Sequence, residues 1–139
     1  MKETNLAKSH KKIGVAVIYN NQGQILIDRR LNKGLMGGLW EFPGGKLEEG
    51  ETIEECIKRE IKEELDIEIN VGNHLITINH DYTKFKVSLI VYLCTHLKGI
   101  PQAIECSEIK WVNVDELNNF TFPEANIGII NALQIYNKK

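Results

Sequence analysis

Residues 44–68, GGKLEEGETIEECIKREIKEELDIE, guide the interpretation of the whole chain because they combine a helix signal with a high density of acid. Between Lys46 and Glu68 the stretch carries 10 of the 19 carboxylates of a chain whose net charge is only −2. Thr52-Ile53-Glu54-Glu55 has the pattern of a capping box, so a helix is expected to begin directly after Thr52. Isoleucine or leucine then recurs at every fourth position over 53–65, which gives this helix one apolar face.

Three carboxylates lie on one side of the expected helix. At about 100° per residue, Glu60 and Glu64 border the apolar face, and Glu63 lies next to them. Like charges at this spacing cost a few tenths of a kcal/mol per pair, and desolvation beside the core adds to that cost. A divalent cation would remove both penalties, because Mg²⁺ prefers carboxylate oxygens. Geometry alone leaves two interpretations open, a metal site and a solvated acidic face.

Strand patterns surround this helix on both sides. They are short runs rich in β-branched and aromatic residues, separated by turn signals. A short helical turn is expected at 115–117 and a last helix over 124–136. The order lacks a regular β-α-β alternation, and it therefore predicts an α+β fold with a mixed sheet and helices on its faces. The expected strands cover residues 13–19, 25–30, 40–43, 67–71, 74–79, 85–97 and 108–114.

The bulk composition limits the class of protein. A length of 139 residues suits a flexible N-terminal tail over 1–11 and a single domain over 12–139. There is no basic stripe, so we expect no nucleic-acid partner. No apolar run approaches the roughly 20 residues that span a bilayer, and the polar start lacks a signal segment. The protein is therefore expected to be soluble and cytoplasmic, with its three cysteines reduced.

The spacing of the acidic stretch resembles the Nudix box, which is GxxxxxE, seven residues, and REUxEExGU, where U is a bulky aliphatic residue. Gly45, Glu51 and the run over 59–67 occupy its specified positions, with one departure. Asp66 stands where the family has Gly, at a helix end where Gly helps by adopting a left-handed conformation. Asp tolerates that conformation better than most residues. We expect the departure to cost some stability without removing metal ligands.

The resemblance implies a helix–sheet–helix sandwich that hydrolyses nucleoside diphosphates linked to another group. In such a protein Glu60, Glu63 and Glu64 hold Mg²⁺ or Mn²⁺, and the backbone of Gly44 can approach the metal closely. Metal ions neutralise the pyrophosphate and orient the attacking water, whose proton passes to a carboxylate. Glu60, Glu63 and a loop glutamate outside the box are the candidates for this catalytic base.

The resemblance also implies roles outside the metal-binding helix face. Glu51 and Arg59 would form an ion pair that fixes the loop to the helix, with Gly45 as the structural glycine of the box. Related enzymes carry a further metal-binding or catalytic glutamate on a loop before the last strand. Glu105 is the favoured candidate for that position, and Glu108 is its competitor.

Two further stretches resemble the MutT branch of the family, which hydrolyses oxidised guanine nucleotides. They are the run over 39–46, LWEFPGGK, and the run over 122–126, FPEAN, which is similar to an FPxAN motif. Oxidation at C8 turns N7 of guanine from an acceptor into a donor, and the amide of Asn126 could accept that proton while donating to O6. Arg30 and Phe42 are the other expected substrate-binding residues. Asn126 as a polar helix start, and Phe42 as core, remain alternative interpretations.

The expected activity is that of a Mg²⁺-dependent diphosphatase that converts 8-oxo-dGTP to the monophosphate and pyrophosphate, with water attacking the β-phosphorus as in the MutT branch. We expect a monomer or a weak dimer. One alternative is the same chemistry on another nucleotide, such as CTP or a dinucleotide. Another is a non-catalytic Nudix module that binds nucleotides, although such a module has no need of the intact glutamates.

Overall fold

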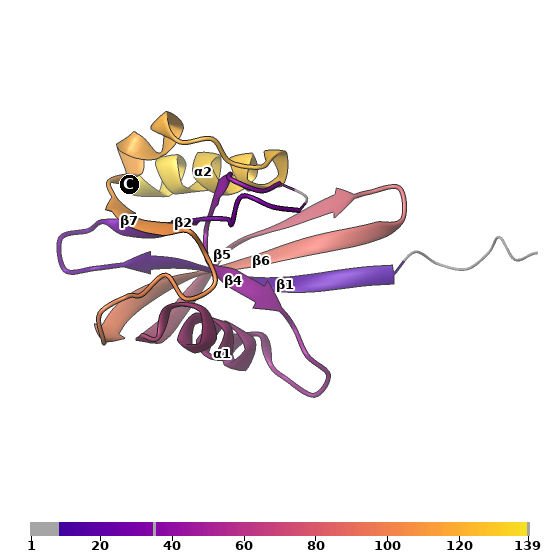
Figure 1. The fold of residues 1–139 in the computed structure, drawn as a ribbon, viewed down its shortest axis with the longest axis horizontal. Helices are drawn as coiled ribbons and strands as arrows, with labels where there is room; N and C mark the ends of the chain where they lie inside the picture. The colour runs from indigo at the N-terminus through magenta and orange to yellow at the C-terminus, as the bar shows by residue number, and fades with distance from the viewer. Residues whose placement is uncertain (1–8, 35, 139) are drawn as a thin grey trace, which may run out of the picture.

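The computed structural model describes residues 9–34 and 36–138, and the statements below concern these residues. Two α-helices and a 3₁₀ helix surround a seven-stranded sheet (Figure 1). No helix in these ranges has both the length and the apolarity needed to cross a bilayer. The helices are α1 (Ile53–Leu65), η2 (Val114–Asn119) and α2 (Glu124–Asn137). The strands are β1 (Ser9–Tyr19), β2 (Ile25–Arg29), β3 (Trp40–Glu41), β4 (Gly44–Lys46), β5 (Glu68–Asp81), β6 (Phe85–Lys98) and β7 (Glu108–Val112).

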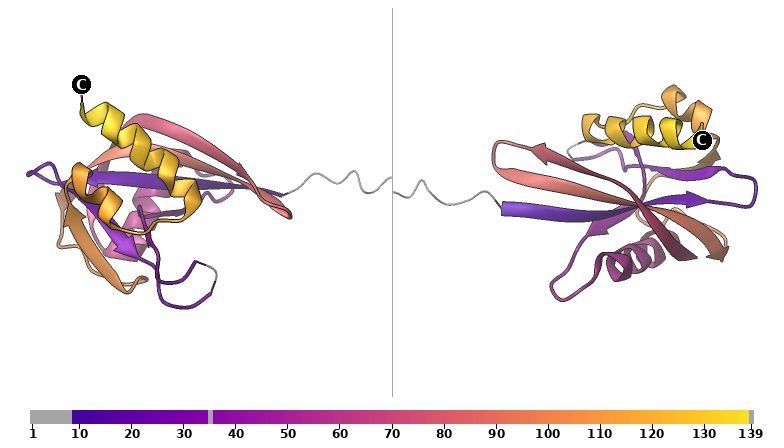
Figure 2. Two further views of the ribbon diagram at one scale, coloured as in Figure 1. Left: turned by 90° about the horizontal axis from the view of Figure 1, so that it is seen from above. Right: turned by 180° about the vertical axis from the view of Figure 1, so that it is seen from behind.

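The sheet is mixed, as the order of elements predicted. Its main path runs β3-β2-β1-β6-β5, with β4 paired to β1 and β7 paired to β2. β1 and β6 are parallel, and the other pairs are antiparallel. Helix α1 covers one face and α2 with η2 covers the other, which Figure 2 shows from two further sides. The predicted helix–sheet–helix sandwich is therefore confirmed.

β1 supplies both layers of the core because its side chains alternate between the two faces of the sheet. Val15 and Val17 pack into the cluster under α2, whereas Ala16 and Ile18 pack into the cluster under α1. All four are 4% exposed or less. A strand buried on both faces reads as a continuous apolar run, which explains the sequence of this segment.

The ends of α1 form as the sequence predicted. The hydroxyl of Thr52 accepts a hydrogen bond from the backbone N–H of Glu55 at 3.1 Å, and the Glu55 carboxylate accepts from the N–H of Thr52 at 2.9 Å. Asp66 adopts the left-handed conformation with φ 57°, and its N–H donates to the carbonyl of Lys62 at 3.0 Å. Asp66 therefore takes the backbone conformation that the family's glycine would supply.

Three differences from the prediction go beyond shifts of one or two residues at the end of an element. β1 begins at Ser9, so residues 9–11 of the predicted tail are a strand, and residues 1–8 lie outside the described residues. This polar segment forms a strand because it pairs in parallel with β6, a long-range partner that its own composition does not reveal. The predicted strands 67–71 and 74–79 are one strand, β5, whose register shifts near His74 absorb the expected break. Gly44–Lys46, which follows the predicted strand 40–43 and was not itself predicted as a strand, pairs with β1 as β4.

Candidate active site

Arg59 holds the loop before α1 against the helix. Its Nε lies 2.6 Å from Oε2 of Glu51 and its Nη2 lies 3.0 Å from Oε1, so the pair is bidentate. Nη2 also donates to the carbonyl of Lys46 at 3.1 Å. Hydrogen bonds from Arg59 and from the N–H of Glu48 hold the pKa of Glu51 at about 2, well below its usual range. The structure thus contains the predicted ion pair between loop and helix.

Gly45 leaves room for the carboxyl group of Glu60. β4 places Gly45 opposite Gly14 of β1, and a Cβ atom on Gly45 would overlap the Glu60 carboxyl group. A Cβ atom on Gly44 would overlap the backbone of Gly14 in the same way. The two glycines therefore permit close approach of strand to strand and of strand to helix.

Replacing Gly45 by Ala is expected to destabilise the protein by about 1 kcal/mol, the lower end of the usual cost of overpacking, because the added methyl group must displace only the carboxyl end of the Glu60 side chain. Chemical unfolding of the two proteins measures the difference. The matched control is Gly45→Ala in a Glu60→Ala background, where the shorter side chain removes the overlap and the cost should fall. An equal cost in both backgrounds would place the strain elsewhere.

Glu60 and Glu63, the two candidates for the general base on α1, share one guanidinium nitrogen. Nη1 of Arg59 lies 2.9 Å from Oε2 of Glu60 and 3.2 Å from Oε1 of Glu63. The Glu60 side chain is 16% exposed and that of Glu63 is 53% exposed, so they occupy a buried and an open position on the same side of the helix. The helical periodicity predicted this arrangement.

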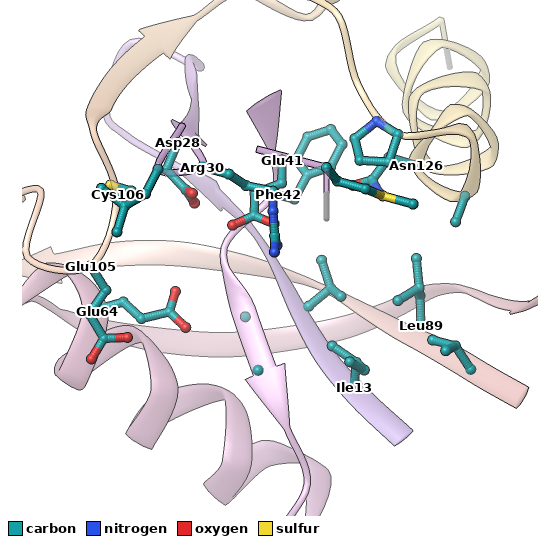
Figure 3. A pocket seen from close by; sticks show the side chains of 18 of the residues that line it. Ile13, Asp28, Arg30, Glu41, Phe42, Glu64, Leu89, Glu105, Cys106 and Asn126 are labelled. Atoms are coloured by element: carbon teal, nitrogen blue, oxygen red, sulfur yellow. The ribbon is translucent and has the colours of Figure 1, made fainter. Parts of the chain in front are cut away.

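Glu64 of α1 faces a cavity that is also lined by residues of the sheet and of the first turn of α2 (Figure 3). Burial raises the pKa of its carboxyl group to about 10, with further contributions from a hydrogen bond to Glu60 and from the charges of Asp28 and Glu41. A carboxyl group with such a pKa retains its proton at neutral pH when no cation is bound.

A loop anchored at both ends brings Glu105 to the same cavity. The N–H of Ile104 donates to the carbonyl of Glu64 at 3.2 Å, and the N–H of Ser107 donates to the carbonyl of Arg29 at 2.9 Å. Glu105 lies between these two anchors and lines the cavity. This position supports Glu105 as the loop glutamate.

Glu108, the competitor of Glu105, occupies a different place. It is the first residue of β7, and its carboxylate lies 3.6 Å from Nη1 of Arg29. It is not among the residues that line the cavity. The geometry therefore favours Glu105 over Glu108.

The cavity has a volume of about 510 Å³ and two chemically different ends. Figure 3 shows carboxyl groups gathered at one end, and apolar side chains with an amide at the other. The acidic end contains Asp28, Glu41, Glu64 and Glu105. The other end contains Ile13, Phe42, Leu89 and Asn126. Such a cavity can hold a molecule that carries phosphates at one end and an aromatic ring at the other.

Asn126 lies in the first turn of α2 and lines the cavity, so the structure brings it to the apolar end. Its backbone N–H donates to the carbonyl of Pro123 at 2.9 Å, which fixes this turn. Phe42 lines the same end but is 4% exposed and stacks on Phe122, with ring centroids 5.2 Å apart. Phe42 is thus both a core residue and a wall of the cavity.

Arg30 lies between the two ends of the cavity (Figure 3). Its Nη1 atom is 3.0 Å from Oε1 of Glu41, and its side chain is 43% exposed. A guanidinium in this position can reach an anion that enters the cavity, but it would exchange its Glu41 partner to do so.

Asp28 was not predicted as a site residue, although it is 3% exposed in β2 and lines the acidic end. The available signal was a carboxylate that directly follows the three apolar residues of this strand, Ile25, Leu26 and Ile27. Burial raises the pKa of Asp28 to about 9. The negative charge of Glu41 and a hydrogen bond to Glu41 raise this pKa further. Cys106, one of the three cysteines expected to be reduced, also lines this end, and burial raises its pKa to about 11.

The donor set at the acidic end fits a hard divalent cation. Every charged donor there is a carboxylate, and oxygen ligands are those that Mg²⁺ and Mn²⁺ prefer. Within residues 9–34 and 36–138 no three His, Cys, Asp or Glu side chains already stand in ligand positions, and Glu60 and Glu63 are both engaged by Arg59. Binding would therefore draw these two carboxylates away from Arg59 and displace the proton of Glu64.

The metal-free protein is expected to lose stability as the pH rises from about 5 to about 9. Glu64 and Asp28 retain their protons in the folded state, with pKa values of about 10 and about 9, but lose them on unfolding, where the values are 4.5 and 3.8. Unfolding then releases protons, so a higher pH favours the unfolded chain. Urea unfolding in EDTA measures the trend. A midpoint urea concentration that rises with pH over this range would contradict the expectation. Added Mg²⁺ should make the midpoint depend less on pH.

Comparisons with known proteins agree with this geometry. The family profile of the NUDIX domain matches residues 14–132. The 8-oxo-dGTP diphosphatase of Buchnera aphidicola subsp. Schizaphis graminum is 36% identical over 134 residues, which cover 96% of this chain and 95% of that protein. The CTP pyrophosphohydrolase of Escherichia coli is 30% identical over 118 residues, 85% of this chain and 87% of that protein.

A solved structure has the same fold. The MutT protein from Methanosarcina mazei Go1 superposes with a TM-score of 0.86 at 28% identity, covering 97% of this chain and 100% of that one. The box that runs from Gly45 to Ile67 thus lies inside a matching profile and a matching fold. Together these findings show that the chain belongs to the Nudix family of hydrolases, which act on phosphoric anhydrides.

Proposed function

We propose that this protein hydrolyses 8-oxo-dGTP to 8-oxo-dGMP and pyrophosphate with Mg²⁺ or Mn²⁺, and so removes an oxidised precursor from the nucleotide pool. The observation that carries the proposal is the position of Asn126 at the apolar end of the cavity whose other end holds Glu64, one of the Nudix glutamates, and the loop residue Glu105. The similarity to a bacterial 8-oxo-dGTP diphosphatase over nearly the whole of both chains supports it. We also propose that the protein is cytoplasmic, in keeping with its free cysteines. We further propose that it is a single domain and a monomer or a weak dimer.

Asn126 would distinguish the oxidised base from guanine. A side-chain amide has one acceptor and two donors, so it can accept the N7 proton of 8-oxoguanine and donate to O6. Ordinary guanine has no proton on N7 and would leave the amide oxygen facing a lone pair. Unpaired polar groups in a closed site discriminate strongly between substrates. Phe42 and Leu89 would enclose the ring from the apolar side.

The acidic end would carry out the hydrolysis. When bound, a divalent cation neutralises the phosphates and makes water more acidic. Glu64, with Glu60 and Glu63 on the same helix face, would hold that cation together with the carbonyl of Gly44. Glu60, Glu63 or Glu105 would accept the proton of the water that attacks the β-phosphorus.

The same chemistry on another nucleotide is the second candidate, because the E. coli CTP pyrophosphohydrolase matches most of this chain. Both candidates use the acidic end of the cavity in the same way. They differ at the apolar end, where the base is selected. Only the first candidate requires Asn126 to recognise an oxidised purine.

A substrate panel tests the proposal directly. We would compare 8-oxo-dGTP, dGTP, CTP, ADP-ribose and a dinucleoside polyphosphate with Mg²⁺, with and without EDTA, and assay pyrophosphate and orthophosphate separately. The expected result is a strong preference for 8-oxo-dGTP, release of pyrophosphate, and no turnover in EDTA. A preference for CTP would select the second candidate. Tight binding of the oxidised nucleotide without turnover would indicate a binding module.

A further inference from the structure

Met36 lines the active-site cavity and has an uncommon backbone conformation. Its φ angle is 63°, and Asp66, with φ 57°, is the only other residue besides glycine with a left-handed backbone in the part of the chain that the structure describes. The short polar side chain of Asp can hydrogen-bond locally in this conformation, but the side chain of Met cannot. Met36 is therefore strained, and residues strained in this way cluster at functional sites.

The connection between β2 and β3 holds Met36 in this conformation. At its base the N–H of Arg30 donates to the carbonyl of Leu39 at 2.8 Å. The carbonyl of Met36 itself accepts a hydrogen bond from the N–H of Leu39 at 3.4 Å. A Cβ atom on Gly37 would lie only 2.6 Å from the backbone nitrogen of Lys33, so the chain turns too tightly there for a side chain. The turn therefore fixes the backbone from which the Met36 side chain reaches the cavity.

The chemistry of a thioether indicates which part of a nucleotide it contacts. The sulfur is uncharged, a weak acceptor and a soft ligand, so it suits neither phosphate nor a hard divalent cation. It does make favourable contacts with aromatic rings. Phe42, on the apolar side of the cavity, also belongs to a core cluster, whereas Met36 belongs to neither of the two clusters formed by the described residues. Met36 therefore has a nucleobase as its best partner.

The sulfur of Met36 is also accessible to oxidants, because the residue is half-buried and lines an open cavity. A hydroperoxide can transfer one oxygen atom to this sulfur. The O–O bond breaks and an S–O bond forms, so the sulfur loses two electrons and the peroxide is reduced to an alcohol or to water. The sulfoxide is polar, and it packs poorly against an apolar ring surface. Cys106, which lines the same cavity, is the competing target of a peroxide.

We propose that Met36 contacts the base of the bound nucleotide and is the residue through which a hydroperoxide modifies this enzyme, an assignment that rests on the proposed function. In the reduced enzyme the thioether packs against the ring of the base. In the oxidised enzyme the sulfoxide oxygen replaces this contact, and the nucleotide binds more weakly. The carboxyl groups that act on the phosphates are unchanged, so a nucleotide that does bind is still hydrolysed. Oxidation therefore raises KM and leaves kcat nearly unchanged.

Treatment of the wild-type enzyme with hydrogen peroxide tests the modification. Mass spectrometry should show one added oxygen on the peptide that contains Met36, which is separate from the peptide of Met1, the other methionine of the chain. KM for 8-oxo-dGTP should rise about tenfold, and methionine sulfoxide reductase should restore it. The matched control is Met36→Leu, which keeps the volume and all three cysteines and should not respond to peroxide. An equal response by Met36→Leu would assign the effect to a cysteine and overturn the proposal.

A second variant separates base binding from a role in the fold. Met36→Gly permits the left-handed backbone without strain, so its thermal midpoint should not fall, whereas its KM should rise about tenfold. A lower midpoint with an unchanged KM would make Met36 a structural residue and refute the proposal. Turnover of 8-oxo-dGTP with the same KM before and after oxidation of Met36 would refute it too, and would leave the proposed function intact. Neither binding nor turnover of 8-oxo-dGTP by the untreated wild type would refute the proposed function itself.

Discussion

Glu64→Gln is expected to lower kcat by on the order of a thousandfold and to leave the fold intact. A metal ligand contributes several kcal/mol of transition-state stabilisation, and each 1.36 kcal/mol corresponds to a factor of ten in rate. Gln keeps the shape of the side chain and removes its charge. Because Glu64 carries a proton in the metal-free protein, the neutral replacement should cost little stability there. Steady-state kinetics and thermal unfolding of the same preparation measure both effects.

The matched control is Glu54→Gln on the same helix. Glu54 pairs with Lys58 at the surface, 3.2 Å away, and its side chain is 57% exposed. It should retain the kcat of the wild type. Near-normal turnover by Glu64→Gln would remove this residue from the metal ligands, whereas an unfolded variant would assign it a structural role.

Asn126→Ala is expected to reduce the preference for 8-oxo-dGTP over dGTP by about 10- to 100-fold. The oxidised base loses the hydrogen bond from its N7–H, worth roughly 0.5–1.5 kcal/mol, and plain guanine no longer places its N7 lone pair against the amide oxygen, a mismatch worth roughly 1–3 kcal/mol. The hydrogen bond to O6 is available to both bases and does not contribute to the preference. The loss should fall mainly on KM, since the amide lies at the end of the cavity away from the glutamates. The ratio of kcat/KM values for the two substrates is the measurement.

Asn131→Ala provides the control for this second variant, because Asn131 is exposed on the same helix. It should leave the ratio unchanged. If Asn126→Ala weakens both substrates equally, the side chain positions the nucleotide without recognising the oxidised base. In that case the second candidate substrate would gain support.

Local sequence was sufficient for α1 and for the carboxylates on it. The capping box at Thr52, the apolar residue at every fourth position and the left-handed Asp66 depend only on residues within a few turns, so their pattern could be recognised before any tertiary contact was known. The same periodicity put Glu60 near the core and Glu63 at the surface. The run of β-branched and aromatic residues over 13–19 likewise predicted a strand, which is part of β1.

Long-range pairing could not be predicted in the same way. Ser9 begins a strand only because Phe85, far away in the sequence, lies beside it in the parallel pair of β1 and β6. The separation of Glu105 from Glu108 depends on backbone hydrogen bonds that tie their loop to α1 and β2. A local window contains none of these partners.

The sequence by itself determined the family, the mixed α+β fold and the helix that carries the glutamates, because these follow from periodicity and from a motif of fixed spacing. Only the tertiary structure decided which carboxyl groups share the cavity. Asp28 and Glu41 lie on different strands, and they meet Glu64 because the β2–β3 pairing and the packing of α1 direct all three to one face. Burial then changes their chemistry, since desolvation and neighbouring charge, neither of which the sequence displays, raise the pKa values of Asp28 and Glu64.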